Sequence, residues 1–548
     1  MNSSTRLPKT TFPTYKNDAQ TEEKLFSAFC EELAPIFILS DSAECNKNIS
    51  IVLKMIVDYL EDQKELFHLC SKLALRVLRL TLFVKNHRLC IAKFLMLLDV
   101  LSQPDAGSCD EAAKTLEVFT LVVLLLMLKI FSQADSTDHF NVIKPAELML
   151  ALEELYFFET ICTLISRRAK ALDNSRSSYI LIKFNCDIVF QYLFHTVLLS
   201  ESQFAALSES DVIPNVIKHL LSMGCFNNYN SRDEDSEDIR KLISYEEFNL
   251  ILLLNEQYMM RLLTTSTLTN KVFECLCVEK ANSTNGICAF TNILVYHMNR
   301  EESHVIKILM LKFLYLIFTL SFSASLPYLN DLKILVDIII RELDNLNYCS
   351  EDDDSSLLAL TYAKVLFPLL KFSQLSDLKP AYKPAEIAEV LSNIILNCET
   401  SLERTLKSDG DHSDAIVKTA VKCFSMPCLR ISKPTSRVAQ LITHLNESKD
   451  TCVSSVRAAS ANDYSKTNQT LVSKKLENLT PSEDSFYSVF ELQQSLNSMS
   501  VTNPSLDSKV SPPIRRSRVQ PASSSILMKA LQKKAPPPPP TPHQRRII

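Results

Sequence analysis

The sequence predicts an all-α protein, built as an armadillo- or HEAT-like helical-repeat array and followed by a disordered, proline-containing tail. Apolar residues recur at helical spacing in one segment after another, and no segment alternates as a half-buried strand does. Only four glycines occur in 548 residues, which leaves little of the turn chemistry that a β-rich domain needs. With 46% hydrophobic residues the chain can bury a large core, and stacked helix pairs are one way to bury it.

The pattern is densest from Asn299 to Leu375, where three apolar helices follow one another almost without a break. The middle helix has a continuous apolar face, made of Leu332, Leu335, Val336, Ile339 and Leu343. Asn330 or Asp331 is expected to cap its N-terminus, because either side chain accepts hydrogen bonds from free backbone N–H groups. A narrow polar stripe remains, made of Lys333, Asp337, Arg341 and Asp344. Its spacing predicts two opposite-charge pairs at i,i+4.

Sixteen helical segments are expected in all, and they define an array over residues 21–430. They cover 22–36, 47–60, 64–84, 86–102, 110–132, 144–169, 178–199, 210–222, 240–262, 268–278, 285–298, 303–322, 331–346, 356–372, 384–398 and 413–425. No fixed repeat period is visible, so the repeats are expected to be degenerate. The polar residues 1–20 predict a disordered lead.

A series of polar and apolar positions agrees, in order, with a known family. The matching residues are Asn299, Arg300 and Glu301; Ile308, Leu309, Leu311, Lys312, Leu314, Tyr315, Phe318 and Thr319; Tyr328, Asn330, Asp331, Leu332, Leu335, Asp337, Arg341 and Leu343; and Thr361, Tyr362, Val365, Leu366, Pro368, Leu369 and Leu370. Two further pieces match, LLLNEQYM at Leu252–Met259 and Tyr382–Lys383. Over residues 252–383 the chain therefore resembles the leucine-rich-domain family, also called WISH/DIP, of activators of the actin-related protein 2/3 complex. The acidic insert at Ser350–Asp354 departs from that pattern.

The resemblance implies a function in actin assembly. Members of this family bind the complex through an armadillo-like helical domain and activate it without a preformed mother filament, so that linear filaments form. Fungal members with a proline-rich tail are recruited to cortical actin patches during endocytosis through SH3-domain proteins. The resemblance thus implies a cytoplasmic, cytoskeletal protein whose partners are the complex and SH3-domain endocytic proteins.

The polar residues in and beside the family positions are candidates for partner contact. They are Asn255, Gln257, Arg300, Lys333, Asp337 and Arg341. A structural explanation stands beside this one, because caps, i,i+4 pairs and satisfied buried groups also fix how one helix pair stacks on the next. The sequence leaves both explanations open.

After residue 430 the composition shifts to Ser, Thr, Asn, Gln and Pro, which predicts a disordered tail over 431–548. This tail carries 16 Lys and Arg against 8 Asp and Glu, a net charge of +8, so the first 430 residues carry −13 of the total of −5. A basic tail on an acidic body is compatible with contact to actin or a membrane surface. The run RRSR at Arg515–Arg518 is short and lacks interleaved aromatic residues, so no nucleic-acid partner is expected.

The most specific feature of the tail is KKAPPPPPTP at Lys533–Pro542. Consecutive prolines favour a polyproline II helix, which is already ordered before it binds. Lys533, Pro536 and Pro539 fit the basic-first arrangement of SH3 ligands, in which two prolines fill aromatic slots and the cation meets an acidic loop. A profilin ligand and an inert spacer are the alternatives.

The sequence offers no catalytic, cofactor or metal site. It has no Gly-rich phosphate loop, G-x-S-x-G elbow or kinase motif set. The closest histidines, His297 and His304, and the pair Cys275 and Cys277 lack companion metal ligands. The 16 cysteines show no paired spacing, which favours free thiols in a reducing compartment. The most apolar run, Val118–Leu128, is shorter than the about 20 residues of a membrane span, so we expect neither an enzyme nor a membrane span.

Two other functions remain open at this stage. The chain fits an endocytic scaffold whose array only docks and whose tail recruits SH3 partners, without nucleation activity. It also fits a helical-repeat transport adaptor, for which the proline run would be incidental.

Overall fold

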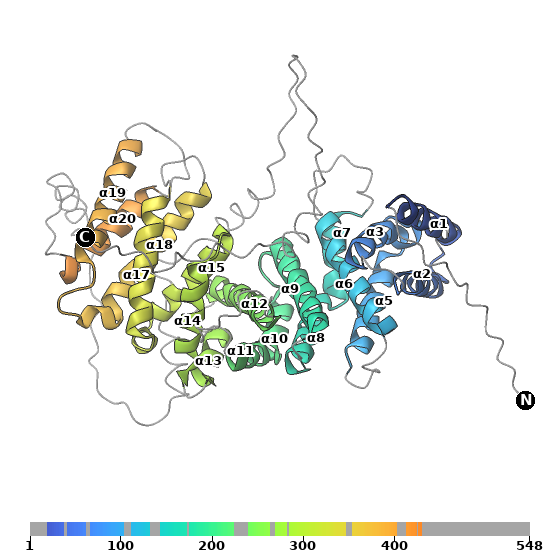
Figure 1. Cartoon of the computed structure of the whole chain (residues 1–548), viewed down its shortest axis with the longest axis horizontal. Helices are drawn as coiled ribbons and strands as arrows, with labels where there is room; N and C mark the ends of the chain where they lie inside the picture. Colours follow the sequence, from blue (N-terminus) through green and yellow to red (C-terminus); the bar gives the residue numbers. More distant parts are fainter. Residues whose placement is uncertain are drawn as a thin grey trace, which may run out of the picture. The chain divides into compact units, whose positions relative to one another are not determined.

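The chain is described from a computed structural model, in which all described residues lie within one compact unit, Met1–Ser498 (Figure 1). The structure describes residues 19–37, 41–61, 66–103, 111–131, 143–171, 175–223, 239–262, 269–281, 284–346, 353–402, 413–424 and 426–429. The predicted tail, with its polyproline run, and most of the predicted lead lie outside these ranges. The lead expected over residues 1–20 overlaps α1 (Ala19–Phe37) at its last two residues.

Two layers of helices make up the array, and neighbours in sequence are neighbours in space. One layer contains α3 (Leu66–Leu78), α6 (Glu111–Phe131), α9 (Arg176–Thr196), α12 (Ile239–Leu262), α15 (His304–Thr319), α18 (Asp353–Phe372) and α20 (Ser413–Phe424). The other contains α2 (Cys45–Leu60), α5 (His87–Leu101), α8 (Phe157–Ala171), α11 (Val212–Met223), α14 (Gly286–Met298), α17 (Leu329–Asn345) and α19 (Pro384–Leu402). Each helix packs on its neighbours within its own layer and on at least one helix of the other layer.

From the second helix pair to the last, a short element precedes each pair and completes a three-element unit. These elements are α4 (Thr81–Lys85), α7 (Pro145–Glu154), α10 (Glu201–Glu209), α13 (Lys271–Val278), α16 (Ser321–Ala324) and the 3-10 turn η1 (Gln374–Asp377). Stacked units of this kind are those of armadillo-type arrays, so the predicted fold class is confirmed. Connections of very different length separate the units, which explains why the sequence shows no fixed period.

Several predicted segments divide differently in the structure. The single helix expected over 64–84 is two helices, α3 and α4, and the one over 144–169 divides at Tyr156, whose φ is +52°. The helix expected over 303–322 is α15 followed by the separate turn α16, and α10 was not expected at all. Within the described residues there is also one antiparallel pair of short strands, β1 (Lys280–Ala281) and β2 (Thr284–Asn285), where none was expected.

Gly286, which follows the strand pair and begins α14, is required by close packing. A Cβ atom at this position would lie 2.4 Å from the carbonyl oxygen of Leu276 and 3.0 Å from that of Glu279. Backbone atoms do not yield as a flexible side chain would, so only glycine fits this approach of α13 to α14.

The core face predicted for α17 is confirmed, because its five apolar residues are at most 1% exposed. The predicted cap is wrong. The helix begins at Leu329, after Tyr328, and no side chain caps it. Asp331 lies instead in the first turn, where Asn292 of α14 donates a hydrogen bond to its carboxylate at 3.4 Å. Burial raises the pKa of Asp331, and this hydrogen bond partly opposes that effect.

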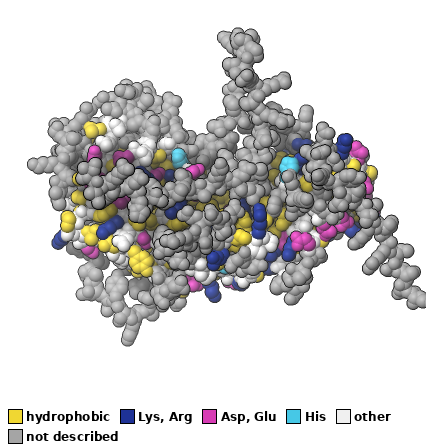
Figure 2. Space-filling view, viewed as in Figure 1, with side chains coloured by type: hydrophobic (Ala, Val, Ile, Leu, Met, Phe, Trp, Pro, Cys, Tyr) yellow, Lys and Arg dark blue, Asp and Glu magenta, His cyan; other side chains and the backbone are white. Residues whose placement is uncertain are grey.

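One segment, Ser355–Phe372 of α18, is long and apolar enough to cross a membrane by length and composition. Its mean hydropathy is 1.3, and 72% of it is buried inside the fold. Because α18 packs against α15, α17 and α20, its place in the helical core accounts for this composition. On the face seen in Figure 2, acidic and basic side chains lie among apolar ones.

Candidate partner-contact site

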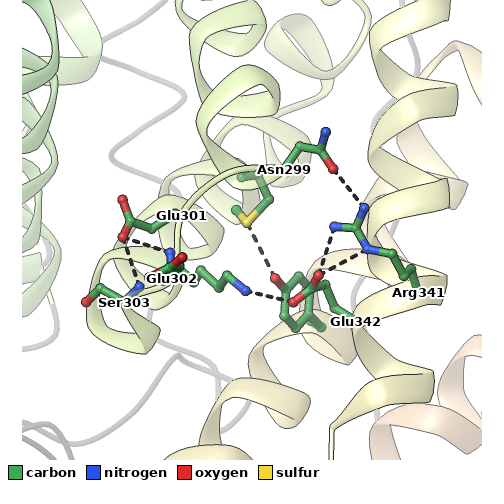
Figure 3. A network of polar contacts seen from close by, with 9 residues as sticks. Asn299, Glu301, Glu302, Ser303, Arg341 and Glu342 are labelled. Carbon is green, nitrogen blue, oxygen red and sulfur yellow. Dashed lines mark hydrogen bonds and ion pairs between the residues drawn. The ribbon is translucent and has the colours of Figure 1, made fainter. Parts of the chain in front are cut away.

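Arg341, in the C-terminal half of α17, holds the loop that joins α14 to α15 (Figure 3). Its Nη1 donates to Asn299 Oδ1 at 2.8 Å, and its Nε and Nη2 donate to Glu342 Oε1 at 3.2 and 2.8 Å. The side chain is 47% exposed, yet these contacts occupy its guanidinium group. Arg341 therefore faces outward but is bound within the fold.

Glu342 extends the same network to α15. Its Oε2 accepts from Lys307 Nζ at 2.7 Å, and the two side chains are only 15% and 12% exposed (Figure 3). Burial works against the charged carboxylate, but the hydrogen bonds and charges of Lys307 and Arg341 outweigh it and lower the pKa of Glu342. The network thus ties α14, α15 and α17 together at one end.

The α14–α15 loop is also held by its own residues. Glu301 Oε1 accepts from the backbone N–H groups of Glu302 and Ser303 at 3.0 and 2.9 Å, and Glu301 Oε2 accepts from the Tyr245 hydroxyl of α12 at 2.6 Å. Arg300 is exposed, with its guanidinium 3.9 Å from the Tyr296 ring centroid and its Nη1 3.0 Å from the Tyr296 carbonyl oxygen. The Arg300 side chain therefore lies on the surface in a fixed position.

The N-terminal half of the stripe is built around Asp337. The Tyr382 hydroxyl lies 3.2 Å from both carboxylate oxygens of Asp337, and Lys383 Nζ lies 2.9 Å from Asp337 Oδ1. Lys333 Nζ lies 5.6 Å from the centroid of the Tyr382 ring. The two i,i+4 pairs predicted within the stripe do not form, because Asp337 binds Tyr382 and Lys383, and Arg341 binds Asn299 and its own neighbour Glu342. The segment before α19 is instead fastened to the outer face of α17.

Residues 240–387 match the family described as SPIN90/Ldb17, leucine-rich domain. Over these residues the chain is similar to that domain, and residues 240–387 are called the leucine-rich domain below. This domain runs from α12 into the start of α19 and includes the stripe, its partners and the predicted signature at 252–383, so the predicted resemblance is confirmed.

Three relatives support this assignment. The chain is 36% identical over 160 residues to Protein LDB17 of Saccharomyces cerevisiae, which is 29% of this chain and 30% of that protein. It is 33% identical over 193 residues to Protein dip1 of Schizosaccharomyces pombe, which is 35% of this chain and 47% of that protein. A longer match, 23% identical over 441 residues, covers 77% of this chain and 86% of Protein LDB17 of Eremothecium gossypii. The first two matches thus span less than half of each relative.

Two candidate residues of the leucine-rich domain face its interior. Gln257 is 2% exposed; its Nε2 donates to the Val197 carbonyl at 2.8 Å, and its Oε1 accepts from the Leu199 N–H at 3.1 Å. It thereby fixes the turn after α9, where Val197 has a φ of +60°. Asn255 is 1% exposed and accepts from Nδ2 of Asn270, which caps α13. In this arrangement both side chains satisfy buried backbone or polar groups and are not accessible to a partner.

Two further polar residues of α12 form buried pairs with other helices, and the sequence did not predict these pairs. Within the leucine-rich domain, Glu256 pairs with Lys312 of α15 at 2.6 Å, and both side chains are almost fully buried. Glu247 accepts from Nδ1 of His219 at 2.7 Å; burial raises the pKa of Glu247, and His219 partly opposes that effect. Lys312 lies in the apolar run ILMLKFLYL, and a charged residue in such a run indicates a buried ion pair. The run does not indicate which residue is the partner.

The three residues predicted to bind an SH3 domain, Lys533, Pro536 and Pro539, lie outside the part of the chain that the structure describes. No group of three or more His, Cys, Asp or Glu side chains that could hold a metal ion occurs among the described residues. His297 stacks on Phe248 within the leucine-rich domain, and burial lowers its pKa to about 3, with Arg300 adding to the effect. This imidazole is therefore uncharged at neutral pH.

Proposed function

We propose that this chain binds and activates the actin-related protein 2/3 complex and so promotes nucleation of linear actin filaments without a preformed mother filament. The SPIN90/Ldb17 leucine-rich domain at residues 240–387 carries the proposal, together with the family resemblance of those same residues. The chain would act in the cytoplasm, in the assembly of cortical actin patches during endocytosis. It would do so as a binding protein and not as an enzyme.

The mechanism we propose is a shift of a conformational equilibrium. A ligand favours one state of its partner only by the difference in its affinity for the two states. To take the complex from mostly inactive to mostly active, the array must bind the active arrangement about 10⁴-fold more tightly. A rigid two-layer array suits this function, because ion pairs between helices keep its surface in one shape, such as Lys307–Glu342 between the layers and Glu256–Lys312 within one layer.

The direct test is a pyrene-actin assembly assay with the full chain and purified complex, and without filament seeds. We expect the lag before assembly to shorten and the filaments to be unbranched when viewed by fluorescence microscopy. An unchanged lag would favour a non-nucleating scaffold or a transport adaptor instead. An SH3 pull-down would then separate these two, because only the scaffold should be captured through its tail.

We propose in addition that SH3-domain proteins recruit the chain through its proline run. Changing Pro536 and Pro539 to Ala should abolish capture by an SH3 domain, because these residues would fill its two aromatic slots. Nucleation by the array should not change. The matched control is the double change of Pro504 and Pro521 to Ala, which removes prolines outside the run and should leave capture intact. Loss of nucleation in the first variant would contradict this division of labour.

A further inference from the structure

The outer face of α5 carries an apolar row that no described residue covers. Leu89, Met96 and Val100 are 51%, 51% and 56% exposed. Their spacings of seven and four residues return to one side of a helix, so the three side chains form a row about 16 Å long. Every other described helix has at most one exposed large apolar side chain. Among the described helices, α5 therefore presents the longest apolar row to solvent.

The next helices of the same layer have polar outer faces. The exposed residues of α8 include Thr163 and Lys170, and those of α11 are Lys218 and Ser222. An apolar side chain that remains in water adds no stability to the array. A row of such side chains on one helix, beside helices with polar outer faces, indicates a surface that packs against another segment.

The tail of the same chain contains a segment of matching form. Residues 480–498 lie outside the described residues, and their sequence predicts a capped amphipathic helix. Thr480 and Glu483 have the spacing of a capping box, and Pro481 stands at the first helical position. One apolar face follows at helical spacing, made of Phe486, Val489, Leu492 and Leu496. This face is about 15 Å long, and a helix of this size is marginal in water unless it packs on an apolar surface.

The charges of the segment and of α5 are complementary. Lys93 lies within the α5 row, between Leu89 and Met96. The charged residues beside the row are already paired, Arg88 with Glu154 and Asp99 with Arg167. Residues 480–498 contain no Lys or Arg and three acidic residues, which are Glu483, Asp484 and Glu491. A segment of negative charge therefore suits the one cation in the row.

The connecting chain is long enough to bring the two together. Fifty residues, 430–479, separate the last described residue, Leu429, from Thr480. Extended, they span at most about 165–180 Å. The 3-10 turn that ends at Leu429 contacts α19, and five steps along the layer lead from α19 to α5, a distance of about 40–50 Å at ordinary helix spacing. Because both surfaces belong to one chain, the segment has an effective concentration that a free partner would have to match.

We propose that residues 480–498 fold into a helix and dock on the outer face of α5 in the same chain. The apolar face of this helix packs against Leu89, Met96 and Val100, and its negative charge complements Lys93. Because α5 lies outside residues 240–387, the docked helix leaves the leucine-rich domain free. The inference goes beyond the function proposed above and does not depend on it.

Hydrogen exchange of the full chain, followed by mass spectrometry, tests the docking. In the wild type, the backbone amides of residues 485–498 should exchange at least tenfold more slowly than in the variant Met96→Asp with Val100→Asp. The control is Val278→Asp with Ile334→Asp, which alters exposed apolar side chains on α13 and α17 and should keep the slow exchange. Circular dichroism should show that both variants remain folded, because the altered side chains are partly or largely exposed.

The reverse change is measured on α5. A docked helix covers the Met96 thioether, so hydrogen peroxide should convert it to the sulfoxide several-fold more slowly in the wild type than in the variant Leu492→Asp with Leu496→Asp. These two substitutions lie outside the array and should not affect its folding. Met259 of α12, which is partly buried, is the internal reference and should be oxidised at the same rate in both chains.

Several results would overturn the inference. Fast exchange of residues 485–498 in the wild type would show that they do not fold on the array. Equally slow exchange in the α5 variant would show that they dock elsewhere, and equal losses in the α5 variant and the control would show that the effect is not specific to α5. If the slow exchange disappeared on dilution and the chain sedimented as a dimer, the segment of a second copy would occupy the row, and docking within one chain would be wrong.

Discussion

Changing Leu335 to Asp is expected to unfold the helical array. Leu335 is 0% exposed at the centre of the α17 face that packs into the core, and Ile339, one turn later, is equally buried. Burying a polar group without a hydrogen-bond partner costs about 2–7 kcal/mol, depending on the reference state, and burying an unpaired carboxylate costs more. The whole free energy of unfolding of a domain is about 5–15 kcal/mol. Circular dichroism should show loss of helix, or a melting temperature many degrees lower.

The matched control is the same substitution one residue earlier. Ile334 has nearly the same volume and lies on the same helix, but it is 45% exposed. Ile334→Asp should therefore melt like the wild type. If Leu335→Asp were soluble, fully helical and unchanged in melting temperature, the assignment of this face to the core would be backwards.

Burial of this face was predictable because spacing alone determines it. Positions such as Leu332, Leu335 and Ile339 return to one side of a helix whatever lies opposite them. The all-α class follows from the same periodicity repeated along the chain. The unexpected helix α10 also carries a sequence signal, because Ser200 and Gln203 form a capping box in the structure and stand at the spacing that such a box requires.

Helix ends within long apolar segments were not predictable in the same way. The segment 144–169 keeps its apolar pattern through Tyr156, where the backbone turns to a φ of +52° and α7 ends. The pattern continues because both helices bury apolar residues, such as Leu152 and Phe157, in the same core. Periodicity reports burial, and burial does not stop where the helix axis changes direction.

Side-chain partners were the least predictable feature. Local spacing pairs Asp337 with Lys333 and Arg341, but the array places Tyr382 and Lys383 against it instead. An i,i+4 pair contributes only about 0.2–0.5 kcal/mol, so a tertiary partner with better geometry readily replaces it. Which partner arrives depends on how helix pairs stack, and the sequence of α17 does not contain that information.

The buried pair of Glu256 and Lys312 provides the second large effect. These side chains are 5% and 4% exposed and join α12 to α15 at the beginning of the leucine-rich domain. Glu256→Leu or Lys312→Met alone should each destabilise the array by about 3–5 kcal/mol, because each leaves one buried charge without its counter-charge. Urea unfolding followed by circular dichroism measures the loss as a lower midpoint.

Together, the two substitutions should cost far less than their sum. A buried ion pair replaced by apolar side chains of similar volume is often neutral, or more stable by about 1–4 kcal/mol, since neither charge must then be taken out of water. Glu256 favours this outcome, because its Oε2 atom is buried with no hydrogen-bond partner while Oε1 alone meets Lys312 Nζ. The exposed pair Glu44–Lys47, with side chains 57% and 69% exposed, is the control, and its removal should change stability by less than about 1 kcal/mol. Additive losses in the double variant would show that Glu256 and Lys312 stabilise the array through separate neighbours and not through each other.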